Sequence, residues 1–123
     1  MSETQTTNLD IQCAELGRKM SRIPGVEEKT INAALAVLEE QGPYAMFLFL
    51  QARHGNVARD INREALEFLR SVFQGQLNET NDILKAIEEL SENLDDLLFA
   101  RDLLRTALSY ARYHLKAKGG GAS

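Results

Sequence analysis

The chain runs from Asn78 to Lys118 without a glycine or a proline, so no residue in this stretch forces a turn. Its apolar residues recur at alternating steps of four and three positions, with Arg101 in the one missing position, which is the heptad pattern of an amphipathic helix. They are Ile83, Ile87, Leu90, Leu94, Leu97, Leu104, Leu108, Ala111 and Leu115. The pattern predicts either one long helix or two helices broken at 91–93. Ser91 favours two helices because serine is a good N-cap.

Shorter helices are expected before this stretch, because each periodic apolar segment ends at a glycine or a proline. The breaks are Pro24-Gly25, Gly42-Pro43, Gly55 and Gln74-Gly75-Gln76. We expect the first helix to open at a capping box, with Thr7 as the N-cap and Asp10 three residues later. The second covers residues 26–40, and the fourth runs from an Asn56 cap to about Phe73.

The third segment, Tyr44 to Leu50, is apolar throughout and too short to span a membrane. Pro43 suits the first position of a helix, and Gly55 suits the C-terminal cap. We therefore expect a central buried helix. A buried strand is the alternative, because periodicity does not separate the two structures over so few residues.

These patterns predict an all-α fold, a compact bundle of five or six helices with a long C-terminal helical region. The length of 123 residues, 44% apolar and 26% charged, fits one globular domain, which we place at residues 1–118. The last residues, 119–123, are rich in glycine and are expected to form a flexible tail.

Targeting and disulfide signals are missing from the sequence. The first ten residues carry two acids and no base, which is not typical of a secretory signal. The single cysteine, Cys13, allows no intramolecular disulfide and no cysteine-rich zinc site. We expect a cytoplasmic protein with no membrane partner.

Few residues are suited to catalysis. His54 and His114 are the only histidines, and neither lies in a Glu-x-x-His or His-Glu-x-x-His motif. Cys13 lies on the apolar face of the first helix, where a buried structural role is expected. We therefore expect no enzyme activity, no metal, no cofactor and no small-molecule substrate. A small enzyme that uses His54 is a distant alternative.

Charge is distributed unevenly along the last third of the chain. Residues 79–98 hold seven acids and one base, whereas residues 99–118 hold five bases and one acid. On a helical wheel four of these bases fall within an arc of about 60°, an arrangement that could follow a phosphate backbone. Two further arginine groups occur earlier in the chain. The predicted phosphate-facing residues are Arg101, Arg105, Arg112 and Lys116, followed by Arg18, Arg22, Arg53 and Arg59. The alternative is that each group is only a solvated face.

Apolar side chains also cover more of the last helix than one buried stripe needs, extending to Phe99 and Tyr110. The surplus suggests contact with another protein or with a second copy of this chain. We predict that Phe99 and Tyr110, together with Asp95 and Asp96 of the acidic segment, lie in a protein interface. Asp95 and Asp96 would meet a basic patch of the next copy.

Two stretches carry a family resemblance. Residues 42–53 combine a glycine, an Ala-Met-Phe-Leu run and a final base, and Phe99–Ala117 contains Arg101, Ala107-Leu108 and Arg112-Tyr113-His114. They resemble the central and final helices of the small subunit of the type III-B (Cmr) CRISPR RNA-guided effector complex. The small subunit of the related type III-A complex is also short and helical, and stays an alternative.

The resemblance implies a non-catalytic structural subunit that acts in antiviral defence. Copies of it would stack head to tail in a filament beside the other CRISPR effector subunits, and would contact the backbones of guide RNA and target RNA. The alternative is a helical adaptor or self-assembling protein-interaction module with no nucleic-acid role.

Overall fold

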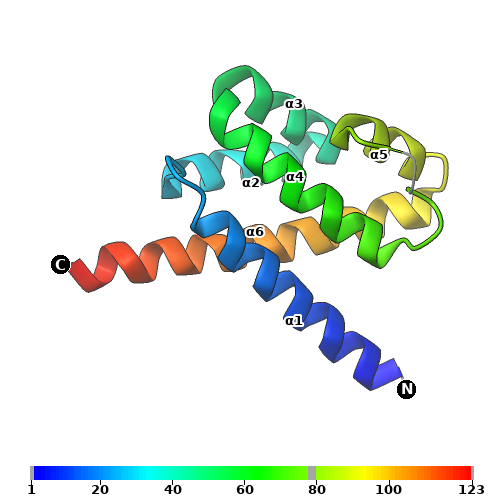
Figure 1. Cartoon of the computed structure of the whole chain (residues 1–123), viewed down its shortest axis with the longest axis horizontal. Coiled ribbons are helices and arrows are strands. Elements are labelled where there is room, and N and C mark those ends of the chain that lie inside the picture. The colour runs from blue at the N-terminus through cyan, green and yellow to red at the C-terminus, as the bar shows by residue number, and fades with distance from the viewer. Residues whose placement is uncertain (1, 78–79, 123) are drawn as a thin grey trace.

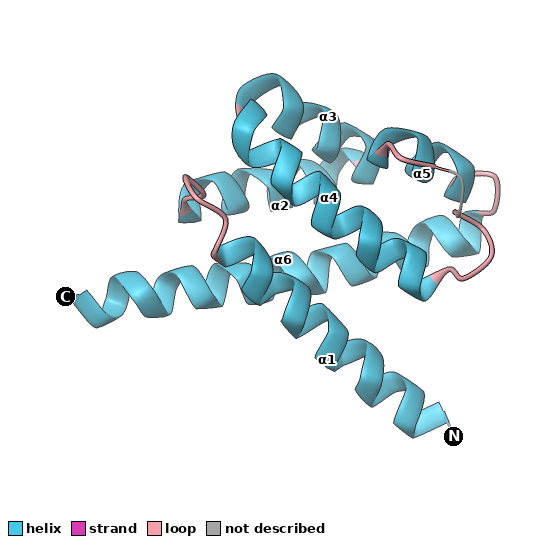
Figure 2. Ribbon diagram, viewed as in Figure 1, coloured by secondary structure: helices cyan, strands magenta, loops and turns pink. Residues whose placement is uncertain are grey.

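The computed structural model describes residues 2–77 and 80–122, and these residues form six α-helices with no strand among them (Figures 1 and 2). The helices are α1 (Ser2–Ser21), α2 (Glu28–Gln41), α3 (Pro43–Arg53), α4 (Gly55–Val72), α5 (Ile83–Leu90) and α6 (Leu94–Ala122). The predicted all-α bundle with a long C-terminal helix is confirmed. None of the described helices is both long and apolar enough to cross a membrane.

The apolar run from Tyr44 to Leu50 is helical, as expected, and the strand alternative is wrong. Pro43 occupies the start of α3, where its missing N–H costs nothing. The expected C-terminal cap at Gly55 is also wrong, because His54 closes α3 with its N–H bonded to the Leu50 carbonyl. Gly55 is instead the first residue of α4, so a single junction residue separates two helices.

The chain does break between α5 and α6 at 91–93, which confirms two helices rather than one. The N-cap of α6, however, is Asn93, whose side-chain oxygen accepts a hydrogen bond of 3.2 Å from the Asp96 N–H. Ser91 instead donates its hydroxyl to the Glu88 carbonyl at 2.6 Å. Ser91 and Asn93 are both short polar residues suited to an N-cap. The path of the chain through the break determines which of them caps α6.

Two helices are longer than the sequence indicates. α1 begins at Ser2, before the expected capping box at Thr7. α6 continues to Ala122, so the segment 119–122, which we expect to be a flexible tail, forms the last turn of this helix, and Ser123 lies outside the described residues. Glycine lowers helix propensity by about 1 kcal/mol per residue but, unlike proline, it keeps the backbone N–H that a helix needs.

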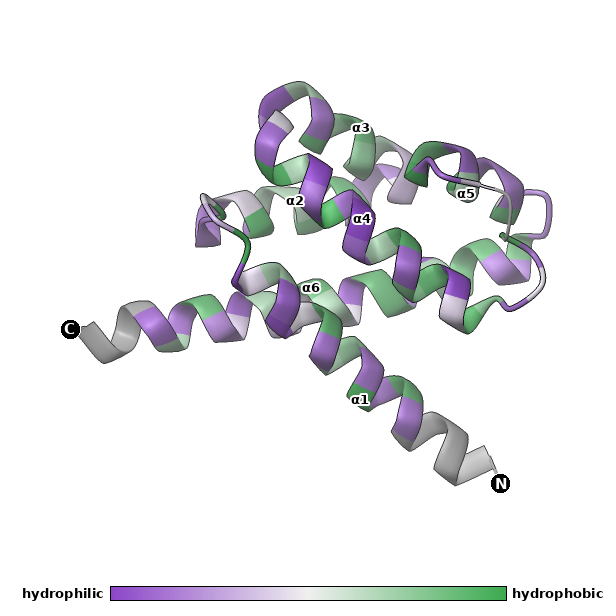
Figure 3. Cartoon of the chain, in the orientation of Figure 1, coloured by the Kyte–Doolittle hydropathy of each residue, from purple (hydrophilic) through white to green (hydrophobic). Residues whose placement is uncertain are grey.

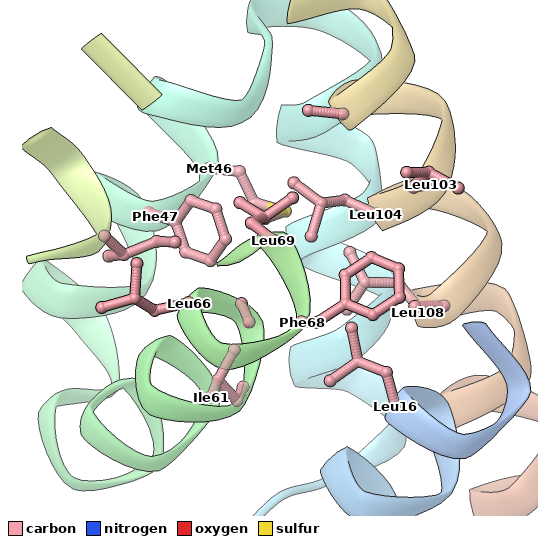
Figure 4. Packing of buried hydrophobic residues seen from close by; sticks show 14 of the residues in the cluster. Leu16, Met46, Phe47, Ile61, Leu66, Phe68, Leu69, Leu103, Leu104 and Leu108 are labelled. Carbon is pink, nitrogen blue, oxygen red and sulfur yellow. The ribbon is translucent and has the colours of Figure 1, made fainter. Parts of the chain in front are cut away.

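One hydrophobic cluster draws side chains from all six helices. Figure 4 shows part of it, where Leu69 of α4 and Leu104 of α6 lie next to each other, with Phe47 of α3 on one side and Leu16 of α1 on the other. All four are almost fully buried. Along α4, polar and apolar residues alternate in bands around the helix (Figure 3), as expected for an amphipathic helix with one face in the core.

The crossing of α1 and α6 is the most extensive contact between two helices. A Cβ atom on Gly17 would lie 2.5 Å from the Ala107 carbonyl oxygen and 2.6 Å from the Tyr110 Cβ, so the two backbones touch at this point. Cys13 is buried one turn earlier, with its thiol 3.6 Å from the Leu103 carbonyl oxygen, as a structural role predicts. Beyond the crossing, the first part of α1 and the last part of α6 project in different directions (Figure 1).

Candidate nucleic-acid interface

The stripe predicted on α6 lies beside α2, and its first half is engaged there. The Arg101 guanidinium donates to the Glu39 carbonyl at 3.0 Å and lies 3.9 Å from the Glu39 carboxylate. Arg105 pairs with the same carboxylate and with Asp102, at 3.3 Å for the second contact. These two guanidinium groups therefore share two carboxylates and present less net charge to a phosphate than the sequence suggests.

The second half of the stripe also forms an ion pair with a glutamate of α2, eleven residues further along α6. Lys116 lies 3.5 Å from the Glu28 carboxylate at the start of α2. Glu28 and Glu39 have the same separation of eleven residues as Lys116 and Arg105, in the reverse direction, so α2 runs antiparallel to α6 and is paired to it at both ends. Neither glutamate was predicted as a partner from the sequence, although the matching separation of eleven residues is a signal for such a pairing.

Arg112 is the exception in this stripe. No ion pair within the described part of the chain involves it. Its guanidinium carbon lies 5.9 Å from the centre of the Tyr113 ring, within the range of a cation–π contact. Because its charge has no carboxylate partner there, Arg112 is the member of the stripe best placed to meet a phosphate.

The other predicted phosphate-facing residues lie at the ends of helices. Arg18 pairs with Glu15 at 2.9 Å, and Arg59 lies 3.6 Å from Asp60. Arg22, just after α1, and Arg53, the last residue of α3, are both exposed. No ion pair among the described residues involves either of them.

Tertiary contacts bring these separate groups to one end of the molecule. The Lys118 ammonium lies 3.4 Å from the Ser21 carbonyl oxygen, which places the last part of α6 at the end of α1. A Cβ atom on Gly25 would lie 3.6 Å from Val57, so the α1–α2 loop touches the first turn of α4. Figure 1 shows the end of α1, the α3–α4 junction and the projecting part of α6 on the same side of the bundle. We call this side the basic end.

The opposite side of the bundle carries α5 and the first turns of α6 (Figure 1). We call it the acidic end, and its exposed acids are Asp82, Glu88, Glu89, Glu92 and Asp95. Asp96 is half-buried, and its N–H is capped by Asn93. More bases than acids thus gather at one end of the bundle and more acids than bases at the other, although Glu28 and Asp60 lie at the basic end and Lys85 lies at the acidic end.

Of the two aromatic residues predicted at an interface, both make contacts within the chain. The Phe99 ring packs edge-on against Phe73, with centroids 5.8 Å apart, and stays 40% exposed. Tyr110 packs against α1, where its hydroxyl donates to the Asp10 carboxylate at 3.4 Å. The charge on Asp10 raises the pKa of Tyr110 above its ordinary value.

Two exposed leucines, Leu94 and Leu98, lie beside Asp95. Leu94 belongs to the apolar stripe predicted from the sequence, and Leu98 does not. Leu94 is 66% exposed and Leu98 is 44% exposed, and they are one helical turn apart. The heptad pattern places Leu94 on the buried stripe, which is wrong, because this first residue of α6 is mostly exposed. Leu94 and Leu98 thus form a small apolar surface at the acidic end, and Phe99 lies about 100° further around the helix.

The side chains of His54 and Cys13, the candidate catalytic residues of the sequence, are packed within the fold. His54 is half-buried at the α3–α4 junction, edge-on to Phe49 with ring centroids 6.0 Å apart. Burial, with a smaller effect of the Asp10 charge, raises the pKa of the Cys13 thiol to about 11, so the thiol stays protonated at neutral pH. Among the described residues, no three His, Cys, Asp or Glu side chains are grouped so that they could hold a metal ion.

Comparison with known proteins adds no relative to this description. No family model, no curated protein and no solved structure matches the chain.

Proposed function

We propose that this protein is a non-catalytic structural subunit of a type III CRISPR ribonucleoprotein effector, which acts in the cytoplasm in antiviral defence. Copies stack in a filament with the other effector subunits and contact the backbones of guide RNA and target RNA. The observation that carries this proposal is the separation of charge, with a basic end drawn from four helices and an acidic end on α5 and α6.

The basic end supports the RNA contact. Arg22, Arg53 and Arg112 come from three different parts of the chain, and none of them is committed to an ion pair among the described residues. Guanidinium groups bind phosphates through two parallel N–H donors, which suits contact with a backbone of any sequence. Base pairing between guide and target would supply the sequence specificity.

The two unlike ends support the filament. An acidic surface and a basic surface on one molecule are complementary between copies but not within one copy, so the contact is head to tail and propagates. The apolar surface of Leu94 and Leu98 lies within the acidic end and would be covered by such a contact.

A tagged pull-down from the native host, with both protein and RNA identified, tests the assignment. We expect several subunits together with short, discrete guide RNAs. Recovery of the protein alone, or with one unrelated partner and no RNA, would overturn the CRISPR assignment.

RNA binding by the purified protein tests the basic end directly. Replacing Arg22, Arg53 and Arg112 by glutamine should weaken binding to single-stranded RNA. It should also flatten the dependence of log K on log salt by about 0.7 for each phosphate that the protein no longer neutralises. Lys85→Gln is the control, because Lys85 is an exposed cation on α5 at the acidic end. If Lys85→Gln reduces the affinity for RNA as much per charge removed, the affinity depends only on net charge and not on the basic end.

A helical adaptor without a nucleic-acid role is the second candidate, and the exposed pair Leu94 and Leu98 favours it. Apolar contacts are not weakened by salt, whereas the charged contact proposed above is. Self-association that is insensitive to salt, in a protein that binds no RNA, would support the adaptor.

A further inference from the structure

A shallow groove of about 270 Å³ lies on the face of α6 that points away from the core. Its lining residues are Arg105, Thr106, Ser109, Tyr110 and Tyr113. On a helix, residues three and four positions apart lie side by side, so Ser109, Tyr110 and Tyr113 form one continuous surface. Two aromatic rings, two hydroxyl-bearing neighbours and one guanidinium thus line a single solvent-facing groove.

One of the two aromatic rings in this groove is held in place by contacts with α1, and the other is largely exposed to solvent. Tyr110 is held by the Asp10 carboxylate and by the close approach of α1 at Gly17. Tyr113 is 61% exposed, the most exposed aromatic residue among those described. An exposed ring next to a fixed ring is a surface on which a flat, apolar group can stack without reorganising the fold.

The cations of α6 lie along one side of the exposed ring, because Arg105, Arg112 and Lys116 fall within one arc of about 60° around the helix. The Arg112 guanidinium is 5.9 Å from the Tyr113 ring centre, and Arg105 lines the opposite end of the groove. Lys116 follows Tyr113 by three positions on the same helix and lies near its surface. Aromatic faces that alternate with Arg and Lys are the arrangement that binds single-stranded nucleic acid, because the rings stack on bases while the cations meet the phosphates.

We propose that this groove binds an unpaired base of single-stranded RNA, which stacks on Tyr113, while the phosphate next to the base meets Arg112, which has no ion pair among the described residues. The proposal rests on the RNA-binding function above and deepens it, because that function requires only the backbone. It assigns to α6 a contact that a fully paired guide–target duplex cannot make, since paired bases keep their faces stacked on one another.

Binding of a labelled adenosine oligomer to the full chain, followed by fluorescence anisotropy, tests this assignment. Tyr113→Leu keeps an apolar side chain but removes the ring, and should weaken binding by about 5- to 150-fold, the range that stacking on one base supports. Tyr113→Phe should bind like the wild type. Tyr44→Leu is the matched control, because Tyr44 is also exposed but lies on α3.

A second ligand identifies the base as the group that stacks. An abasic sugar–phosphate oligomer of the same length should bind the wild type as weakly as the adenosine oligomer binds Tyr113→Leu, and should bind both proteins equally. The salt dependence should stay the same in Tyr113→Leu, because stacking releases no counterions. Circular dichroism checks that each variant keeps the helical content of the wild type.

The outcomes separate this inference from the function on which it rests. Salt-dependent RNA binding that Tyr113→Leu leaves unchanged would overturn the stacking site and leave the backbone contact intact. Equal reductions in affinity in Tyr113→Leu and Tyr44→Leu would also overturn the site. No RNA binding by the wild type would overturn both proposals, and binding of an apolar peptide in its place would assign the groove to a protein partner.

Discussion

The missing side chain of Gly17 allows α1 and α6 to cross closely. The backbone and first side-chain atoms of α6 occupy the space where its Cβ would lie, at 2.5 Å from Ala107 and 2.6 Å from Tyr110. Neither atom is the end of a flexible chain, so the two helices must separate to admit a methyl group. A glycine inside a helix ordinarily costs stability, and here the close crossing of α1 and α6 explains why it is present.

We predict that Gly17→Ala lowers the free energy of unfolding by about 1–3 kcal/mol, the usual cost of overpacking. Urea denaturation followed by circular dichroism measures this change. Gly55→Ala is the control, because a Cβ atom on Gly55 meets nothing within 4 Å. Gly55→Ala should be neutral or should stabilise by about 0.4–1 kcal/mol, since alanine restricts the unfolded chain. Equal midpoints for the two variants would contradict the close crossing.

Among the elements, the charged face of α6 both pairs with α2 and is the face predicted to meet phosphates. Glu39 faces both Arg101 and Arg105 across the interface, and all three side chains are between 30% and 47% exposed. Half-exposed pairs of this kind contribute about 0–1 kcal/mol each, so they orient the helices more than they stabilise them. The same contacts withhold two guanidinium groups from any phosphate.

We therefore expect Glu39→Gln to increase the affinity for single-stranded RNA at low salt while it lowers stability by at most about 1 kcal/mol. Anisotropy titrations at several salt concentrations, with denaturation in parallel, measure both quantities. Glu40→Gln is the control, because Glu40 is exposed, carries the same charge and has no ion pair among the described residues. If both variants gain affinity equally, the effect is one of net charge and Arg101 and Arg105 take no part.

The elements themselves could be predicted from the sequence because apolar periodicity and glycine or proline breaks are local signals. Pro43 marks the start of α3, and the break at 91–93 lies where expected. The caps could not be predicted as well. Asn93 and Ser91 are both good N-caps, and Gly55 and His54 compete for one junction, so the tertiary path of the chain decides each case.

The candidate site could be predicted only in part, for the same reason. The helical wheel places Arg101, Arg105 and Arg112 on one side of α6, and the structure agrees. It contains no information about Glu39, which is far away in sequence and faces two of these arginines only because α2 packs antiparallel to α6. Nor does it show that Arg22 and Arg53 lie at the same end, which follows from how the helices fold back on one another.

In the molecule as a whole, the basic end and the acidic end lie on opposite sides of the bundle (Figure 1). Reversing Asp95 and Asp96 to lysine should therefore weaken self-assembly, and the wild-type assembly itself should weaken as salt rises, because a Debye length near 8 Å at physiological salt screens such contacts. Sedimentation velocity at low and high salt measures both effects. Glu64→Lys with Glu67→Lys is the control, since it makes the same change of charge on α4, outside the acidic end.

A charge swap distinguishes a head-to-tail contact from a symmetric one. Arg53→Glu with Arg112→Glu reverses the basic end, so this variant alone should also assemble poorly. In a mixture, the reversed acidic end of one variant meets the reversed basic end of the other, and their two unreversed ends are complementary as well. The mixture should therefore recover alternating assemblies as long as those of the wild type. A symmetric contact through the acidic end brings Asp95 of one copy near that of another, and mixing the variants would then restore only pairs. Assembly unchanged by either reversal would remove charge as the basis of the filament.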